Sequence, residues 1–411
     1  MENTFYVGRY IDNEIVRKSS SGGIMTAIAE LFIKNKGVVF GAAYAEDCLK
    51  IKHIIVSQME DLDALRKSKY VWSDYTACFE DLFSYLDRGL SVLFIGTPCQ
   101  CLAVKKKFGG YDNLYLLDFF CHGTLDEKIY YDYIGSLNAK VSKVDFRGEG
   151  IDGDNMTFIV VDSDNKVIVE EKYDENVLTK LFSSSAGLKS GCMQCKIGES
   201  IHMTNITMGD VQFEEMASNH GFDKKHLSFF SVNDERGKEI FEVIKNKLEY
   251  AQLDTRDNGN IDYYYRKRIN STNPWGYNYE LNSWFSKAYN RYGFIEASFR
   301  FMFIDELKIL KKYEFYLTHK NIYLYGAGKQ GLIYKTLIEK YYPTCNLEGY
   351  IVTQKENEEV NGLYVFNSSD IKAKFNIEDI FIIVTVVKNV EIVSHLKAIN
   401  LIEDINFGYR I

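Results

Sequence analysis

Short, uninterrupted runs of hydrophobic residues alternate along this chain with stretches whose hydrophobic residues recur at helical spacing. Residues 92–95 show no polar alternation and end in Gly-Thr-Pro, which is typical of a parallel strand covered on both faces. Thr97 then suits a helix N-cap and Pro98 the first helical position, and Val104 and Phe108 continue one apolar face. The pattern predicts a buried strand that leads directly into a helix.

The same alternation extends over the first 250 residues. A second apolar run, residues 113–120, would lie parallel to the first strand if a right-handed crossover joins them. Further strands are expected at residues 4–9, 37–44, 49–56, 205–210 and 227–233, and another strand is expected to end at residue 147. Helices are expected around residues 24–32, 62–65, 128–134 and 237–248. Residues 156–161 and 166–170 are expected to form a polar hairpin. Residues 1–250 are therefore predicted to form one mixed α/β domain.

Beyond residue 250 the pattern changes twice. Residues 251–320 combine helical periodicity with many aromatic residues, which predicts a helical linker that packs on the first domain; sugar stacking by its tyrosines is the alternative. Residues 321–411 open with a strand, a glycine-rich turn and a helix, and contain further strands at 348–352 and 379–384. This order predicts a small, doubly wound, Rossmann-like C-terminal domain.

The glycine-rich turn of the last domain, Gly326-Ala-Gly328-Lys-Gln-Gly331, has two interpretations. Its glycines either cradle a diphosphate at the helix N-terminus or allow helix and strand to pack closely. The acidic residue that binds the ribose of NAD at the end of the second strand is absent, with Thr353 in its place, so an NAD site is not indicated. The domain is similar to the sugar-nucleotide-binding Rossmann-like domains of polysaccharide enzymes.

Composition narrows the class of protein. A chain of 411 residues with 46% hydrophobic and 26% charged residues is an ordinary globular protein of two or three domains. No apolar run approaches the ~20 residues of a membrane span, and no signal sequence opens the chain, so we expect a cytoplasmic protein without a membrane span. The net charge of −8 argues against nucleic-acid binding.

Eight cysteines in a reducing compartment favour metal binding or catalysis over disulfides. Cys99 falls in the first turn of the helix after the first buried strand, where the helix dipole favours the thiolate. Cys121 ends the second buried strand, so both thiols would emerge at the carboxyl edge of one sheet. Cys192 and Cys195 form a C-x-x-C pair, and the four sulfurs together make a complete metal-ligand set.

Two other stretches carry candidate binding residues. Ser19, Ser20, Ser21, Gly22 and Gly23 precede a well-marked helix beside two cations, so this loop either holds a phosphate or is an ordinary serine cap with a glycine turn. Lys67, Ser68, Lys69 and Tyr70 form a second anion contact with an aromatic face, or a charged helix end. Asp210 ends another short strand and would face the same crevice, unless it is a capping aspartate.

The order of these motifs resembles the coenzyme F(420) hydrogenase/dehydrogenase beta-subunit family over roughly residues 1–250. The resemblance is carried by Ser-Ser-Ser-Gly-Gly, Ser-Lys-Tyr, Gly-Thr-Pro-Cys-Gln, Cys-His-Gly, Phe-Arg, C-x-x-C and Thr-Met-Gly-Asp. It implies an oxidoreductase that binds FAD and a 4Fe-4S cluster and moves electrons between a carrier and an organic substrate or a partner subunit. Residue 67 is a lysine where glycine is common, and Val211 replaces a frequent tryptophan.

The resemblance also implies roles for individual residues. Cys99, Cys121, Cys192 and Cys195 would hold the 4Fe-4S cluster, and residues 19–23 and 67–70 would clasp FAD. His122 and Asp210 would lie near the flavin or the cluster, with His122 as a proton donor or as a hydrogen-bonding group beside a cluster ligand.

We therefore expect a reductase that acts on a sugar or sugar-nucleotide intermediate of cell-surface polysaccharide synthesis. The ferredoxin-like module of long family members does not precede the flavin loop, so the expected donor is a separate ferredoxin or a similar carrier, and partner polysaccharide enzymes are expected too. The alternatives are a subunit that oxidises an electron carrier for a partner enzyme, and a binding scaffold stabilised by zinc on the same four cysteines.

Overall fold

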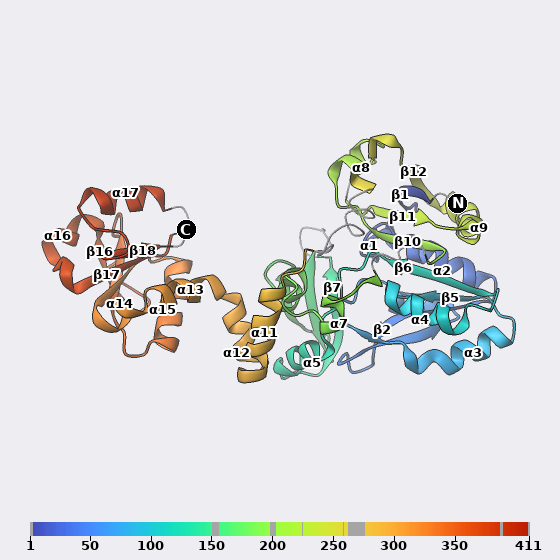
Figure 1. Cartoon of the computed structure of the whole chain (residues 1–411), viewed down its shortest axis with the longest axis horizontal. Helices are drawn as coiled ribbons and strands as arrows, with labels where there is room; N and C mark the ends of the chain where they lie inside the picture. Colours follow the sequence, from blue (N-terminus) through green and yellow to red (C-terminus); the bar gives the residue numbers. More distant parts are fainter. Residues whose placement is uncertain are drawn as a thin grey trace. The chain divides into compact units, whose positions relative to one another are not determined.

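The computed structural model describes residues 3–149, 156–197, 203–223, 225–257, 259–261, 276–386 and 389–409. The chain divides into two compact units, Met1–Ala297 and Ser298–Ile411 (Figure 1). The stretch for which the sequence predicts a linker is shared between them: α11 (Tyr279–Tyr292) belongs to the first unit, and α13 (Ile304–Lys312) and α14 (Glu314–His319) belong to the second. Residues 258 and 262–275 of that stretch lie outside the described residues.

In the described part of the first unit, the main sheet has nine strands in the order β12-β1-β11-β10-β6-β5-β2-β3-β4. The strands are β1 (Thr4–Tyr10), β2 (Val38–Tyr44), β3 (Ile51–Val56), β4 (Ser73–Asp74), β5 (Val92–Ile95), β6 (Leu114–Phe119), β10 (Ile206–Asp210), β11 (Ser228–Val232) and β12 (Leu248–Gln252). Neighbours β2, β5, β6 and β10 run parallel, and the fold is the predicted mixed α/β type.

Helices cover both faces of this sheet. On one face, α2 (Ile24–Lys34) and α9 (Glu235–Ile244) pack on Val39 and Leu93. On the other, α3 (Phe79–Asp87) and α4 (Pro98–Phe108) pack on Phe40 and Phe94. Because successive strand residues enter different cores, residues of β5 are apolar without alternation.

A smaller antiparallel sheet adjoins these layers within the first unit. Among the described residues it consists of β7 (Val141–Gly148), β8 (Thr157–Asp162) and β9 (Val167–Lys172) in that order. The predicted hairpin is therefore two strands of a larger sheet. The shorter helices of the unit are α1 (Asn13–Arg17), α5 (Glu127–Ser136), α6 (Val177–Ser183), α7 (Ser190–Met193), α8 (Glu214–Ser218) and the 3-10 helices η1 (Met59–Leu65), η2 (Thr76–Cys78), η4 (Lys245–Lys247) and η5 (Thr255–Asp257).

The end of the first α/β layer differs from the prediction. The sequence pattern predicts a helix over residues 237–248, but α9 ends at Ile244, and Leu248 begins β12 after the turn η4. β12 pairs antiparallel with β1 from Tyr6↔Gln252 to Tyr10↔Leu248. Backbone hydrogen bonds to this edge of the sheet outweigh the local helical pattern.

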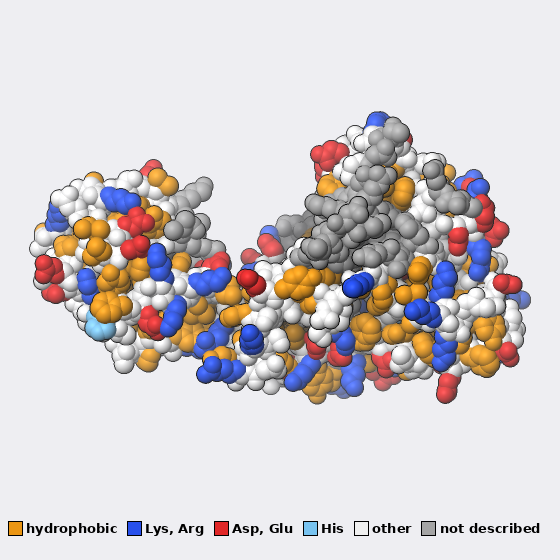
Figure 2. Space-filling view, viewed as in Figure 1, with side chains coloured by type: hydrophobic (Ala, Val, Ile, Leu, Met, Phe, Trp, Pro, Cys, Tyr) orange, Lys and Arg blue, Asp and Glu red, His pale blue; other side chains and the backbone are white. Residues whose placement is uncertain are grey.

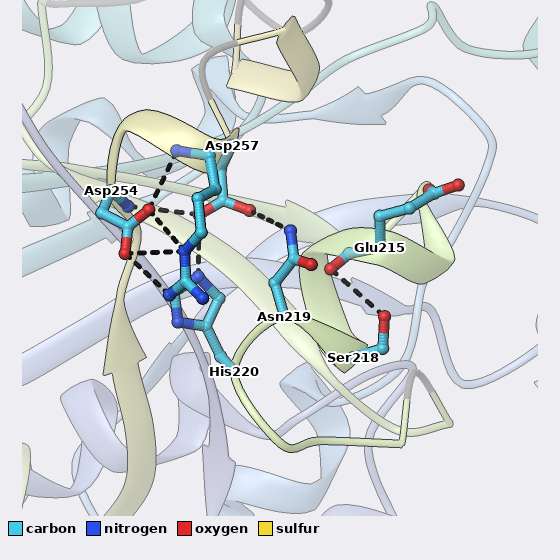
Figure 3. A network of polar contacts seen from close by, with 7 residues as sticks. Glu215, Ser218, Asn219, His220, Asp254 and Asp257 are labelled. Atoms are coloured by element: carbon cyan, nitrogen blue, oxygen red, sulfur yellow. Dashed lines mark hydrogen bonds and ion pairs between the residues drawn. The ribbon is translucent and has the colours of Figure 1, made fainter.

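A buried polar network fixes the chain after β12 to the end of α8 (Figure 3). The Asp257 carboxylate is fully buried, lies 2.7 Å from His220 Nε2, and accepts hydrogen bonds from Asn219 Nδ2 and the Asp254 backbone N–H. Arg256 in turn binds both carboxylate oxygens of Asp254. Because every buried oxygen of Asp257 has a partner, the network stabilises η5 rather than offering a reactive group.

In the described residues of the second unit, a sheet of six strands has the order β15-β16-β14-β13-β17-β18. These are β13 (Asn321–Tyr325), β14 (Asn346–Val352), β15 (Glu359–Val360), β16 (Leu363–Asn367), β17 (Ile380–Val384) and β18 (Phe407–Tyr409). All but β15 are parallel to their neighbours.

Helices cover both faces of the second sheet as well. Residues of α13, α14 and α15 (Lys329–Tyr341) form one core, and α16 (Ile371–Lys374) and α17 (Val390–Ala398) contribute to the other. The remaining elements are α12 (Phe294–Met302), which spans the boundary between units, and the 3-10 helices η6 (Ser368–Asp370) and η7 (Ile377–Asp379). Within the described ranges of the chain, none of the helices is both long and apolar enough to cross a membrane.

Candidate functional site

Three parallel strands deliver predicted site residues to one edge of the main sheet. Cys99 lies in the first turn of α4, directly after β5, Cys121 follows β6 by two residues, and Asp210 ends β10. β5 pairs parallel with β6, and β6 with β10, so the three carboxyl ends meet at the same edge. Ligands of open α/β sheets bind at this edge.

Cys192 and Cys195 join Cys99 and Cys121 at this edge. A Cβ on Gly123 would lie 3.2 Å from the Cβ of Cys192, so the turn after Cys121 packs against α7. Cys121 interacts electrostatically with Cys99, Cys192 and Cys195. The structure thus brings the four predicted cysteines together from three separate segments.

The other cysteines lie in different surroundings. Cys101 is buried on the opposite side of α4, with Sγ 3.5 Å from the Leu117 carbonyl oxygen, and Cys78 donates to the Tyr75 carbonyl. Cys48 is buried, and Cys345 belongs to the second unit.

The electrostatics of Cys99 correct the prediction from the helix dipole. Burial raises the pKa of Cys99, the Thr97 hydroxyl 3.1 Å from its sulfur lowers it, and Cys195 and Cys192 raise it further. Burial raises the pKa of Cys121 in the same way. Burial and the neighbouring thiols therefore favour the protonated form of Cys99, opposite to the effect predicted from the helix dipole.

The spacing of the thiols bears on which metal group fits. Zinc with Zn–S bonds of about 2.3 Å needs sulfurs only about 3.8 Å apart. Among the described residues, no three His, Cys, Asp or Glu side chains form a group that could hold one metal ion. Four cysteine thiolates are nevertheless the ligand set of a 4Fe-4S cluster and also of a structural zinc site, so the donor chemistry fits either group.

His122 lies beside the cysteine group. Its ring centroid is 5.7 Å from that of Phe182 and 5.4 Å from that of Tyr277. Burial raises the pKa of Tyr277, and the nearby thiols Cys121 and Cys192 raise it further. His122 therefore stands between aromatic rings at the edge of the group, a position compatible with either predicted role.

The serine-glycine loop and the lysine-rich segment contact each other directly. Ser20 Oγ accepts a hydrogen bond from the Ser68 backbone N–H at 2.7 Å and lies 3.0 Å from Ser68 Oγ. Ser21 Oγ lies 2.8 Å from Ser228 Oγ, and Ser19 donates to the Ile15 carbonyl. The serine hydroxyls thus tie the loop to its surroundings, and the alternative of a serine cap is wrong, because the N-cap of α2 is Gly23 and no side chain caps it.

The two glycines of this loop are needed for different reasons. A Cβ on Gly22 would lie 2.4 Å from the Gly8 carbonyl oxygen, because the loop passes close to β1. Gly23 has φ of 79° and is the N-cap of α2, a left-handed conformation that favours glycine.

Arg147 connects the motif segments, a role that was not predicted. Its Nη1 donates to the Tyr70 hydroxyl at 3.1 Å and to Asp210 Oδ2 at 3.0 Å, and its Nη2 donates to the Ser20 carbonyl at 3.1 Å. Asp145, two residues earlier, accepts from the Arg147 backbone N–H and binds Lys67 Nζ at 2.6 Å. The signal in the sequence was Phe-Arg at the end of a strand, where a cation is well placed to reach neighbouring segments.

A pocket of about 510 Å³ lies beside this connection. Cationic side chains dominate its wall, together with four carboxylates and Tyr44; the cations are Arg17, Lys18, Arg66, Lys67, Lys69 and Lys143. Asp63 and Asp145 each pair with one of the cations, Arg66 and Lys67 respectively. The pocket therefore presents excess positive charge, which suits an anionic ligand.

Lys69 is the pocket cation with the most perturbed proton affinity. Burial lowers its pKa to about 7, and Asp145 opposes that shift. Its Nζ donates to the carbonyls of Arg66 and Lys67 and lies 5.7 Å from the Tyr44 ring centroid. The Tyr44 hydroxyl is buried, and it has no hydrogen-bond partner among the described residues. Lys69 thus lines the pocket without an ion pair among the described residues, so it can pair with an anionic ligand.

Packing accounts for two of the three glycines in the glycine-rich turn of the second unit. A Cβ on Gly331 would lie 2.0 Å from the Gly326 carbonyl oxygen, and one on Gly326 would lie 2.9 Å from Thr385 Oγ1. Gly328, the N-cap of α15, has open space around its Cβ position. Only Gly328 is left for a role in ligand approach.

Comparison with known proteins gives family matches within the first unit. Residues 5–79 match the model of the N-terminal part of the coenzyme F420 hydrogenase/dehydrogenase beta subunit, and residues 89–256 match that of its C terminus. No protein with a curated description matched. A chain of the xenon-derivatised F420-reducing NiFe hydrogenase complex from Methanosarcina barkeri is 15% identical, with a TM-score of 0.45, over 70% of this chain and 92% of that chain.

The two family models together match more than half of the chain and include the four grouped cysteines, residues 19–23 and 67–70, Arg147 and Asp210. The chain therefore belongs to the coenzyme F420 hydrogenase/dehydrogenase beta subunit family.

Proposed function

We propose that this chain is an oxidoreductase that holds a 4Fe-4S cluster on Cys99, Cys121, Cys192 and Cys195 and FAD beside it. The observation that carries the proposal is the convergence of the four thiols, from three segments, on the carboxyl edge of the parallel strands. Family membership supports the reaction class, since the family is named for hydrogenase and dehydrogenase subunits.

The cluster would transfer single electrons, and FAD would exchange one or two with an organic substrate. Hydrogen-bond donors of the protein lie close to the thiols that would hold the cluster. The Gly123 backbone N–H, 3.3 Å from the Cys121 sulfur, and the Thr124 hydroxyl, 3.6 Å from the Cys192 sulfur, would stabilise negative charge on those sulfurs. His122 would donate or relay a proton beside the thiols, as its place between Phe182 and Tyr277 allows.

The basic pocket supports a phosphate-bearing cofactor. Lys67 and Lys69 line it together with Arg17 and Lys18, which directly precede the serine-glycine loop. Arg147 would hold Ser20, Tyr70 and Asp210 in fixed positions beside residues that line the pocket. We assign the lysines to the FAD diphosphate and Arg147 to the shape of the site.

The second unit supports a role in substrate capture. Its five parallel strands follow the order third, second, first, fourth, fifth along the chain, and this order supports a Rossmann-like assignment. We propose that its glycine turn binds the diphosphate of a nucleotide-linked sugar, that the chain reduces this sugar or a derivative in cell-surface polysaccharide synthesis, and that a ferredoxin-type carrier supplies the electrons.

Purified protein tests the central proposal. An anaerobic preparation should be brown-yellow and contain iron, sulfide and FAD, and serine replacement of Cys99, Cys121, Cys192 or Cys195 should each remove most of the iron, because the cluster needs all four thiolates. Serine replacement of Cys78, Cys101 or Cys345 is the matched control and should leave it. A colourless, zinc-loaded protein would instead establish the zinc scaffold.

Gly328→Val tests the role of the second unit. Nothing lies within 4 Å of the Cβ position, so the fold should be kept while the side chain obstructs the turn. We expect UDP-glucose, as a probe nucleotide sugar, to bind the native chain at least tenfold more tightly than the variant. If the native chain binds no nucleotide sugar, the glycines serve packing alone, and a subunit that oxidises a carrier for a partner enzyme becomes the better description.

A further inference from the structure

The exposed face of α4 connects the cysteine group to the protein surface. Cys99, Leu102, Ala103 and Lys106 are spaced by three, four and seven residues, so they lie on one side of the helix. Leu102 and Ala103 are half-buried and Lys106 is exposed. At 1.5 Å per residue, Lys106 stands only about 10 Å along the helix axis from Cys99.

Cys195 of the C-x-x-C pair and Met203 both lie near this helix. Cys195 interacts electrostatically with Cys99 at the start of α4, and the Met203 carbonyl accepts a hydrogen bond from Lys105 Nζ at 2.6 Å near its end. Met203 is 40% exposed, and Lys196, next to Cys195, is exposed. We call Leu102, Ala103, Lys106, Lys196 and Met203 the α4 surface.

The charge of the α4 surface is opposite to that of the whole chain. The net charge is −8, yet Figure 2 shows Lys and Arg side chains gathered over α4. Among the described residues, neither Lys106 nor Lys196 has an acidic partner, and Asp112, in the loop after α4, forms no ion pair with them. A helix dipole accounts for cations in the last turn of α4 but not for Lys196, which lies outside any helix.

We propose that the α4 surface is the docking site of a small, acidic, one-electron carrier protein of the ferredoxin type, a proposal that rests on the iron-sulfur function above. The apolar residues form the centre of the contact, the lysines attract the carrier's carboxylates, and Cys99 and Cys195 bring the cluster close to that contact. Each carrier molecule loses one electron for each electron that this chain gains. The contact is of the small, transient class used in electron transfer.

The test is the double variant Lys106→Glu/Lys196→Glu in the cofactor-loaded protein, with an acidic bacterial ferredoxin as the probe. Its matched control, Lys287→Glu/Lys372→Glu, makes the same charge change at exposed lysines elsewhere. We expect the double variant to slow reduction by ferredoxin at low ionic strength at least tenfold and to remove most of its salt dependence, since steering by surface charge contributes about 10 to 10³ in rate. The control should stay within twofold of the native rate.

Two further measurements separate this proposal from the proposed function. Photoreduction with free deazariboflavin, with EDTA as the electron donor and the small deazaflavin radical as the reductant, should proceed equally in all three proteins; if it fails in the native protein, the redox function is wrong. Binding of oxidised ferredoxin, followed by calorimetry, does not need the cluster and should be lost in the double variant alone. Equal binding by the double variant, or equal slowing in the control, would overturn the docking site.

Discussion

At the scale of single residues, Lys69 gives the site a dependence on pH. Burial lowers its pKa to about 7, so Lys69 is mostly charged below that pH and mostly neutral above it. The affinity of flavin-free protein for FAD should therefore fall about tenfold between pH 6 and 8.5, a size consistent with one partly screened charge pair. Lys69→Met should bind FAD weakly at both values, and Lys69→Arg, charged throughout, should lose the pH dependence. Titration by flavin fluorescence measures all three.

The lowered pKa of Lys69 also affects the stability of the folded protein, and this effect increases with pH whereas the affinity for FAD decreases. Between about pH 7 and the ordinary lysine value of 10.5, the unfolded chain holds a proton on Lys69 that the folded protein lacks. The contribution of Lys69 to the stability of the protein without FAD therefore rises with pH across that window.

An unchanged pH profile of FAD affinity in Lys69→Met would show that another group is responsible for the pH dependence of FAD binding.

Cys99, Cys121, Cys192 and Cys195 could be identified from sequence because each stands in a recognisable local context, a strand end or a C-x-x-C pair. Arg147 could not, since its contact with Ser20 joins residues 127 apart in the chain. The raised pKa of Cys99 was also out of reach, because desolvation depends on tertiary packing rather than on position in a helix.

At the scale of elements, the loop before α2 depends on one close backbone approach. In Gly22→Ala the new Cβ would lie 2.4 Å from the Gly8 oxygen and 2.9 Å from the Ser228 nitrogen, and both are backbone atoms of neighbouring strands. We expect the free energy of unfolding of the first unit to fall by about 2–3 kcal/mol. All three tryptophans belong to this unit, so urea unfolding followed by tryptophan fluorescence reports it selectively.

The control for this prediction is Gly135→Ala in α5, where nothing lies within 4 Å of the new Cβ. That variant should gain about 0.5–1 kcal/mol, as alanine is the better helix former. Equal stability of Gly22→Ala and the native chain would mean that the loop can move away from β1, and the serine ties to Ser68 and Ser228 would then be too weak to define the site.

Long, strongly apolar or strongly periodic elements were predictable: β5, α4, β6, α2 and α15 lie where the pattern placed them. Short polar strands were not. β12 has mostly exposed side chains and β15 has two residues, and both exist because an adjacent strand offers unpaired backbone groups. Such edge strands leave little hydrophobic signal in the sequence.

At the scale of the molecule, the proposed redox chemistry belongs to the first unit alone. The grouped cysteines and the basic pocket lie within Met1–Ala297, and the cores of the two units share no residues. α12 contributes to both, with Phe294 against Tyr133 in the first unit and Phe299 in the core of the second. A fragment that is to fold alone should therefore keep the whole of α12.

We expect fragment 1–302 to retain the iron, the FAD and the ferredoxin-driven reduction of the full chain, and fragment 294–411 to fold independently and to carry any affinity for nucleotide sugar. Iron and flavin assays, tryptophan fluorescence and circular dichroism of each fragment provide the comparison. Cofactor loss from a folded 1–302 would place a cofactor-binding residue beyond α12. Nucleotide-sugar binding by 1–302 would instead move substrate recognition to the pocket of Lys67 and Lys69, leaving the second unit without a role in catalysis.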